Sequence, residues 1–131
     1  MQSRCPRMIE YFILYQDGVH WQQEPAIIGW DPDGCSLLDF MYQAIGCRSI
    51  ECIRFRNFSG EVLGIVDEEG LFKSNLRANA VGSLMYGQRI VGRMLVGQQG
   101  ERNGEPDIVG FASKRDAWHA HCMIQNHIQR M

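Results

Sequence analysis

Turn-forming residues break the apolar part of this sequence into short runs, and this pattern limits the folds that it can adopt. Glycine, proline, aspartate and asparagine gather between the runs, most densely at Asp31-Pro32-Asp33-Gly34. The runs themselves are rich in Val, Ile, Phe and Tyr, which strands favour. The sequence therefore predicts several short strands joined by tight turns.

The strand pattern also predicts how the chain connects. Gln16-Asp17-Gly18 is expected to form a hairpin turn between the first two strands, because glycine tolerates positive φ. Residues 97–105 are polar and are expected to form a loop. Strands are expected at residues 8–15, 19–30 with a break at Pro25, 49–56, 61–66, 89–96 and 107–111.

Capping residues mark the expected helices, which begin at the N-caps Ser36, Asn79 and Ser113. Gly46 is expected to end the first helix. The order of elements predicts an α+β fold: a mostly antiparallel sheet of about six strands, one helix, one short helix and a C-terminal amphipathic helix, with the helices on one side. The last helix carries an apolar stripe that the chain's own sheet or a second subunit must cover, formed by Ala117, His121, Ile124, Ile128 and Met131.

Length and charge set broad limits on function. The chain has 131 residues, which suits a flexible leader at 1–7, an α+β body at 8–112 and the last helix of the same domain at 113–131. A net charge of −2 argues against binding of long nucleic acid, and no apolar run nears the roughly 20 residues that span a bilayer. Five cysteines in no regular framework, without an export signal, predict reduced thiols in a cytoplasm.

The motifs for catalysis and metal binding are weak. Cys35 precedes a helix start that could activate its thiol, but no partnered base accompanies it. His119 and Cys122 share one face of a helix, yet two ligands do not make a zinc site. Asp67-Glu68-Glu69-Gly70 fits a solvated turn. We therefore expect a protein that is not an enzyme and that holds no metal or cofactor.

Basic residues supply the strongest candidate for a binding site. Arg54 and Arg93 are expected on exposed strand faces, while Lys73 and Arg77 precede the helix that Asn79 caps. Arginines that converge on a helix N-terminus can bind a diphosphate. We predict a ligand site around Arg77 and Asn79, with Lys73 and one or both of Arg54 and Arg93 reaching toward it. Solvent exposure is the simpler explanation for any one of these charges, and capping alone would explain Asn79.

A series of short motifs resembles a small family of phage and bacterial proteins catalogued as a domain of unknown function. The resemblance covers about residues 8–112, and the chain departs from it in the polar segment 97–105 and in the His-rich last helix. The motifs follow one another in the order Leu37-Leu38 with Met41, Ile45-Gly46, Ile50-Glu51, Val66-Asp67-Glu68-Glu69-Gly70-Leu71, Asn79-Ala80 with Leu84, Ile90-Val91-Gly92 and Leu95-Val96.

That family is in turn similar to the phage Thoeris anti-defence sponges, which sequester cyclic ADP-ribose-type signals, and in some members cyclic oligonucleotides, without cleaving them. The resemblance implies a cytoplasmic counter-defence protein of an infected bacterium that binds a small cyclic nucleotide as a homo-oligomer. The main alternative is a phage-derived protein that binds and inhibits or assists a host enzyme. A third hypothesis is a small enzyme such as a cyclic-nucleotide hydrolase.

Overall fold

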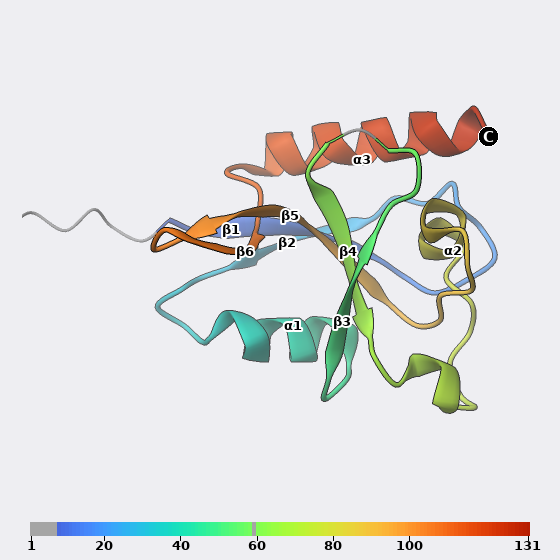
Figure 1. Ribbon diagram of the computed structural model, residues 1–131, viewed down its shortest axis with the longest axis horizontal. Helices are drawn as coiled ribbons and strands as arrows, with labels where there is room; N and C mark the ends of the chain where they lie inside the picture. The colour runs from blue at the N-terminus through green and yellow to red at the C-terminus, as the bar shows by residue number, and fades with distance from the viewer. Residues whose placement is uncertain (1–7, 59) are drawn as a thin grey trace, which may run out of the picture.

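An antiparallel sheet of six strands forms the centre of the structure, and helices lie against both of its faces (Figure 1). The computed structural model describes residues 8–58 and 60–131, so the predicted leader at 1–7 lies outside the described residues. The strands are β1 (Glu10–Tyr15), β2 (Ala26–Trp30), β3 (Ile50–Arg54), β4 (Val62–Asp67), β5 (Met94–Arg102) and β6 (Glu105–Val109). The predicted α+β class is confirmed, but the prediction that the helices share one side is wrong.

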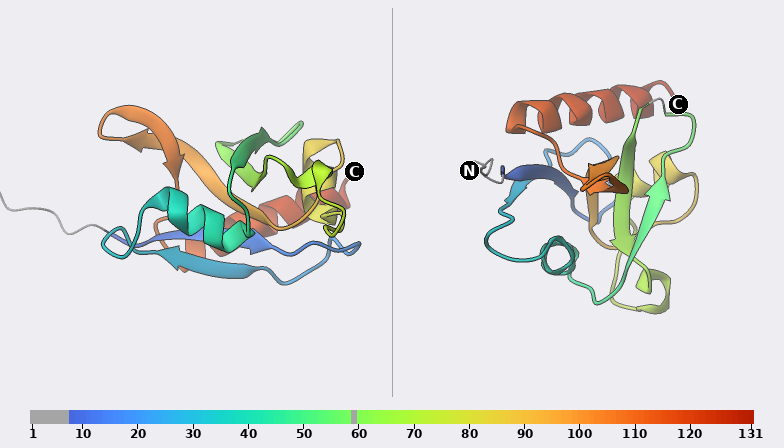
Figure 2. Two further views of the ribbon diagram at one scale, coloured as in Figure 1. Left: turned by 90° about the horizontal axis from the view of Figure 1, so that it is seen from below. Right: turned by 60° about the vertical axis from the view of Figure 1, so that its left-hand side comes forward.

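The strands are ordered β2-β1-β5-β4-β3, which leaves β2 and β3 at the two edges. β5 is the longest strand and has two successive neighbours on one side. Its first part pairs with β1 at residues 94–96, and its second part pairs with β6 at residues 98–102. The β5–β6 hairpin consequently extends beyond the rest of the sheet (Figure 2).

Two connections differ from the sequence prediction. The predicted loop at 97–105 is wrong because β5 continues through it, and the hairpin turns at Asn103 and Gly104, whose φ values are 55° and 80°. Such Asn-Gly turns match the twist of paired strands. The predicted hairpin turn at 16–18 is also wrong, since β2 begins only at Ala26. Gly18 instead pairs with the start of a helix, donating its N–H to the carbonyl of Ala78 at 2.7 Å.

The helices are α1 (Leu37–Ile45), α2 (Ala80–Tyr86) and α3 (Lys114–Gln129), with a 3₁₀ helix at Gly70–Phe72. Their predicted caps are confirmed. The Ser36 hydroxyl accepts a hydrogen bond from the Asp39 N–H, Ser113 does the same for α3, and Gly46 ends α1 with left-handed backbone. These ends are local features, and local sequence predicts them well.

Each face of the sheet has its own apolar core. Met41 and Ile45 of α1 pack on one face, against Phe12, Ile65 and Leu95. The other face packs against α2 and α3, where the buried residues of α3 are Ala117, Ala120, His121, Ile124 and Ile128. The chain's own sheet therefore covers the predicted stripe except Met131, which lies beyond the end of α3 and is 61% exposed.

Further features of the described residues bear on function. No helix among them is long and apolar enough to cross a membrane. No three His, Cys, Asp or Glu side chains within the described ranges lie together as metal ligands would. Cys35, Cys47, Cys52 and Cys122 are free thiols.

Candidate functional site

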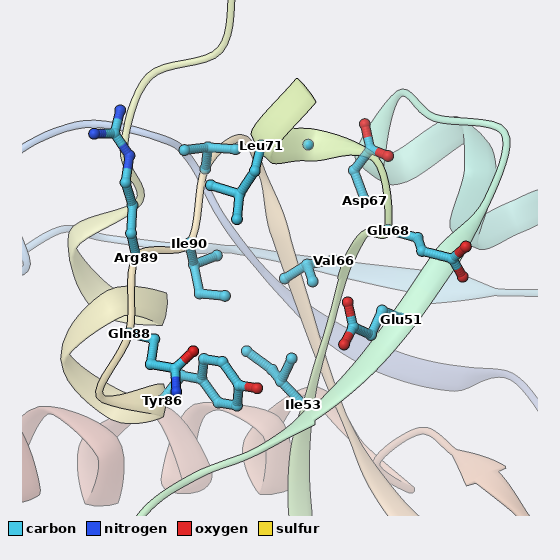
Figure 3. Close-up of a pocket in the computed structure, with 12 residues that line it drawn as sticks. Glu51, Ile53, Val66, Asp67, Glu68, Leu71, Tyr86, Gln88, Arg89 and Ile90 are labelled. Atoms are coloured by element: carbon cyan, nitrogen blue, oxygen red, sulfur yellow. The ribbon is translucent and has the colours of Figure 1, made fainter. Parts of the chain in front are cut away.

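A cleft of about 170 Å³ opens between the β3 edge of the sheet and the segment that follows α2 (Figure 3). Its floor is apolar, because Ile53 of β3, Val66 of β4 and Ile90 all face it and are buried. Gly70 closes one end, where any side chain would collide with Val91. Three segments that are distant in sequence thus meet around one hollow.

Carboxylates line the sheet side of this cleft. Glu51 and Glu68 are both exposed and project from the same face of β3 and β4 as Ile53 (Figure 3). In the register of these strands they are diagonal neighbours, which places their Cα atoms about 7–8 Å apart. Arg89 lies on the opposite side and points away, and no salt bridge joins it to either glutamate among the described residues.

Asp67 also borders the cleft, but its charge is neutralised within the chain. Its carboxylate lies 2.5 Å from the Lys73 ammonium and also accepts the Glu69 N–H at 2.9 Å. The hydrogen bond with Asp67 raises the pKa of Lys73, so this lysine keeps its charge. Among the described residues that line the cleft, Glu51 and Glu68 on the sheet side and Arg89 on the opposite side are left as charges without a salt bridge.

Two apolar side chains stand exposed beside these carboxylates. Leu71 and Phe72 of the 3₁₀ helix are 66% and 89% exposed, and Leu71 lines the cleft. Large apolar side chains grouped at a hollow are typical of binding surfaces. We call the set Glu51, Ile53, Glu68, Leu71 and Ile90 the β3 cleft; Phe72 is the exposed neighbour of Leu71 in sequence.

Asn79, predicted as either cap or ligand contact, is fully buried. Its Oδ1 accepts the Gly82 N–H at 2.9 Å, which caps α2. Its Nδ2 donates to the carbonyls of Tyr15 at 3.2 Å and Gly92 at 2.9 Å. These bonds account for both ends of the amide, so the structure supports the capping explanation.

The predicted basic residues fall into separate places. Arg77 pairs with Asp17 at 3.2 Å, and Arg93 donates to Gln16 at 3.2 Å, so these two lie at one loop. Lys73 turns away to Asp67. Arg54 lies opposite Leu63 of β4, and Leu63 lies opposite Gly97 of β5. Gly97 is four residues beyond Arg93, so Arg54 is displaced from Arg93 by roughly 13 Å along the strand direction. The structure groups Arg77 with Arg93 and separates the others.

Sequence reasoning missed a cationic hollow of about 480 Å³ at the ends of α2 and α3. Arg56, His127 and Arg130 line it together with Leu84 and Met131, and no carboxylate side chain from the described part of the chain does. Nothing in the local sequence joins Arg56 to Arg130, because only the packing of α3 brings them together. The carbonyl ends of the two helices also attract cations to this place.

A buried polar pair joins α3 to β1. The Tyr15 hydroxyl lies 2.7 Å from Nδ1 of His121, and both residues are buried. Burial lowers the pKa of His121 and raises that of Tyr15, so it favours the neutral form of both the ring and the phenol. This pair is a structural link in the core and does not face the cleft. Burial also raises the pKa values of Cys47 and Cys52, which makes their thiols poor nucleophiles.

Comparison with known proteins identifies the family. Residues 12–109 match the family model of a domain of unknown function, DUF3846. This region runs from β1 to the end of β6 and includes the whole β3 cleft, while α3 follows it. No curated protein and no solved structure matches the chain. The similarity to the Thoeris anti-defence sponges stays a prediction, whereas the match to a domain of unknown function is confirmed: the chain belongs to the DUF3846 family.

Proposed function

We propose that this protein is a non-catalytic binding protein that contacts a protein partner through the β3 cleft. The observation that carries the proposal is the exposure of Leu71, which lines an apolar-floored cleft, together with that of Phe72, the next residue of the same 3₁₀ helix. Small-molecule sites usually measure about 300–1,000 Å³. A hollow of about 170 Å³ is better matched to one side chain of a partner. This favours the protein-binding alternative over a nucleotide ligand at this place.

Affinity capture from a bacterial lysate tests the proposal when it is tied to a matched pair of variants. Leu71→Ser with Phe72→Ser removes the exposed apolar side chains, and Met123→Ser removes one of comparable size from the exposed side of α3. A partner retained by the parent and by Met123→Ser, but lost from the double variant, supports the proposal. Equal retention by all three proteins contradicts it. Thermal unfolding of each protein excludes loss through misfolding.

Nucleotide sequestration is a second candidate function, and the cationic hollow favours it. Its volume of about 480 Å³ lies in the range of small-molecule sites. The carbonyl ends of α2 and α3 disfavour an anion at this place, but Arg56 and Arg130 carry full positive charges and could each bind a phosphate through two parallel hydrogen bonds. A cyclic ADP-ribose-like molecule or a cyclic oligonucleotide would supply such phosphates, and holding it would serve the predicted counter-defence role in a bacterial cytoplasm.

Native mass spectrometry with a panel of cyclic nucleotides tests this second function. Arg56→Ala and Arg130→Ala should weaken binding, and Arg115→Ala, at the exposed start of α3, should not. Weakening by Arg77→Ala instead would place the ligand at the originally predicted site. Recovery of the intact ligand from heat-denatured complex would separate sequestration from hydrolysis. The same spectra report stoichiometry, and so test the predicted homo-oligomer.

A further inference from the structure

The outer edge of β3 has backbone groups available for another strand. The Glu68 N–H donates to the Ser49 carbonyl at 3.2 Å, which identifies Ser49 and Glu68 as a hydrogen-bonded pair. Such pairs alternate along an antiparallel ladder. The N–H and C=O groups of Ile50, Cys52 and Arg54 therefore point away from β4, and β3 is the last strand on this side of the sheet (Figure 2).

The same alternation determines which side chains an added strand would meet. Glu51 and Ile53 occupy the positions between the outward-pointing groups. In an antiparallel pair such positions bring opposing Cα atoms to about 4.5 Å, closer than the hydrogen-bonded positions do. Both side chains face the cleft. A residue of the added strand opposite Glu51 would lie next to that carboxylate at the outer rim of the cleft, and Glu68 would lie one strand further in, on the β4 side.

The negative charges of Glu51 and Glu68 favour a cationic residue opposite Glu51 in the added strand. Glu51 and Glu68 are neighbouring carboxylates with no salt bridge to a cation among the described residues, and opposite charges on facing strands stabilise pairing. Lysine or arginine could place its charge between them while its methylene stem lies on the apolar floor. The residue two positions earlier in the partner would face Ile53 and should be apolar.

We infer that the partner binds as an extended segment that adds an antiparallel strand to β3, with an apolar residue opposite Ile53 and a lysine or arginine opposite Glu51. This inference rests on the proposed protein-binding function and specifies its partner. Main-chain hydrogen bonds to Ile50, Cys52 and Arg54 provide the affinity, and the β3 cleft provides the specificity, as in other cases of strand addition.

Three capped peptides provide a direct probe. The first is Thr-Val-Thr-Val-Thr-Lys-Thr, the second carries Glu in place of Lys, and the third carries Pro in place of the Thr that precedes Lys, whose N–H would bond to Cys52. The lysine peptide should bind at least about tenfold more tightly than either other peptide, since a tenfold ratio corresponds to about 1.4 kcal/mol. In NMR spectra, binding should shift the amide signals of Ile50, Cys52 and Arg54 and leave those of β2 in place.

A charge swap sharpens the test. Glu51→Lys should reverse the preference, so that the glutamate peptide binds better than the lysine peptide. Glu101→Lys is the matched control, because Glu101 is an exposed carboxylate on the β5–β6 hairpin and its change alters net charge equally. Cys52→Pro should abolish binding, because proline removes an outward N–H that β4 does not use. If that variant does not fold, the amide shifts of the parent still decide the outcome.

Other outcomes overturn the inference. One is failure of the lysine peptide to bind at millimolar concentration, and another is a shift of amides elsewhere than in β3. A dimer in sedimentation with the β3 amides already protected would show that a second copy of the chain occupies the edge. A captured lysate partner that depends on Phe72 but is indifferent to Glu51→Lys would refute strand addition while leaving protein binding in place. If the double variant Leu71→Ser with Phe72→Ser captures the partner as well as the parent does, the proposed function itself is refuted.

Discussion

Two pairs of carboxylates at opposite ends of the sheet are treated differently by the fold. At the hairpin end, Arg102 binds Glu10 through two hydrogen bonds of 2.7 and 3.1 Å and Asp107 through one of 3.0 Å. Its guanidinium also lies 5.3 Å from the centre of the Trp30 ring. At the cleft end, no cation within residues 8–58 and 60–131 forms a salt bridge with Glu51 or Glu68. The first pair helps to hold the hairpin, and the second is left available for a partner.

The pKa of Glu10 is lowered, in part because its charge is neutralised by Arg102. Burial raises the pKa of this carboxyl, but hydrogen bonds from Arg102 and the Gly110 N–H more than offset that effect and leave it below its usual value. The hydrogen bond with Glu10 likewise raises the pKa of Arg102. Charges that the chain itself neutralises contribute to folding, whereas unneutralised surface charges can contribute to recognition.

The largest loss of stability is expected at Asn79, a buried amide whose oxygen and nitrogen both form hydrogen bonds within the chain. Asn79→Ala removes the α2 cap and leaves two buried carbonyls, of Tyr15 and Gly92, without their donor. We expect it to lower the free energy of unfolding by about 3 kcal/mol, combining a lost cap with lost buried hydrogen bonds. Ser36→Ala, at an exposed cap, should cost only about 1 kcal/mol. Urea unfolding of both variants measures the difference, and similar losses would contradict the structure.

The second largest loss of stability is expected from removing Arg102, which binds Glu10 and Asp107 at the β5–β6 hairpin. Arg102→Ala leaves Glu10, whose side chain is 18% exposed, without its cation and removes the contact with Trp30. We expect a loss of about 2 kcal/mol, less than for a fully buried pair because both side chains retain some solvent. Arg89→Ala at the cleft should change stability by less than about 0.5 kcal/mol. Equal losses in urea unfolding would show that the two ends do not differ.

A third effect concerns pH and the Tyr15–His121 pair. Because the pKa of His121 is lower in the folded protein, the unfolded chain binds more protons between the two pKa values. Stability should therefore fall as the pH drops below about 6.5, the ordinary value for histidine. This single group can contribute at most about 1.4 kcal/mol per pH unit. His121→Phe should remove that component from denaturation curves, and His20→Gln, at an exposed position, should retain it.

Sequence reasoning succeeded where structure is local. The caps Ser36, Asn79 and Ser113 each form bonds within three or four residues, so the chain segment itself contains the information. The course of β5 was misjudged, because polar residues at 97–102 belong to a strand only through pairing with β6. Its one local signal, Asn103-Gly104, was outweighed by the low apolar content. The placement of α1 on the other face likewise depends on long-range packing.

The candidate site was harder to predict for the same physical reason. The β3 cleft joins positions near 51, 68, 71 and 90, and only the tertiary fold brings these segments together. Reading arginines as a convergent set ignored the acceptors that the chain supplies, such as Asp17 for Arg77. For Lys73 the partner Asp67 lies six residues earlier, at the end of β4, and that short separation was the one available signal.

The smallest effect should have the opposite sign. Glu51→Lys replaces one of two neighbouring like charges by its opposite, and diagonal pairs of this kind contribute a few tenths of a kcal/mol. We expect the variant to be more stable than the parent by about 0.2–0.5 kcal/mol at low salt. Because both side chains are exposed, the gain should vanish near 1 M salt, where charges are screened within about 3 Å. Glu10→Lys should instead destabilise the protein at both salt concentrations, since it places a cation against Arg102. Urea unfolding of the two variants at both salt concentrations makes the comparison directly, and a loss of stability in Glu51→Lys would show that Glu51 already serves the fold.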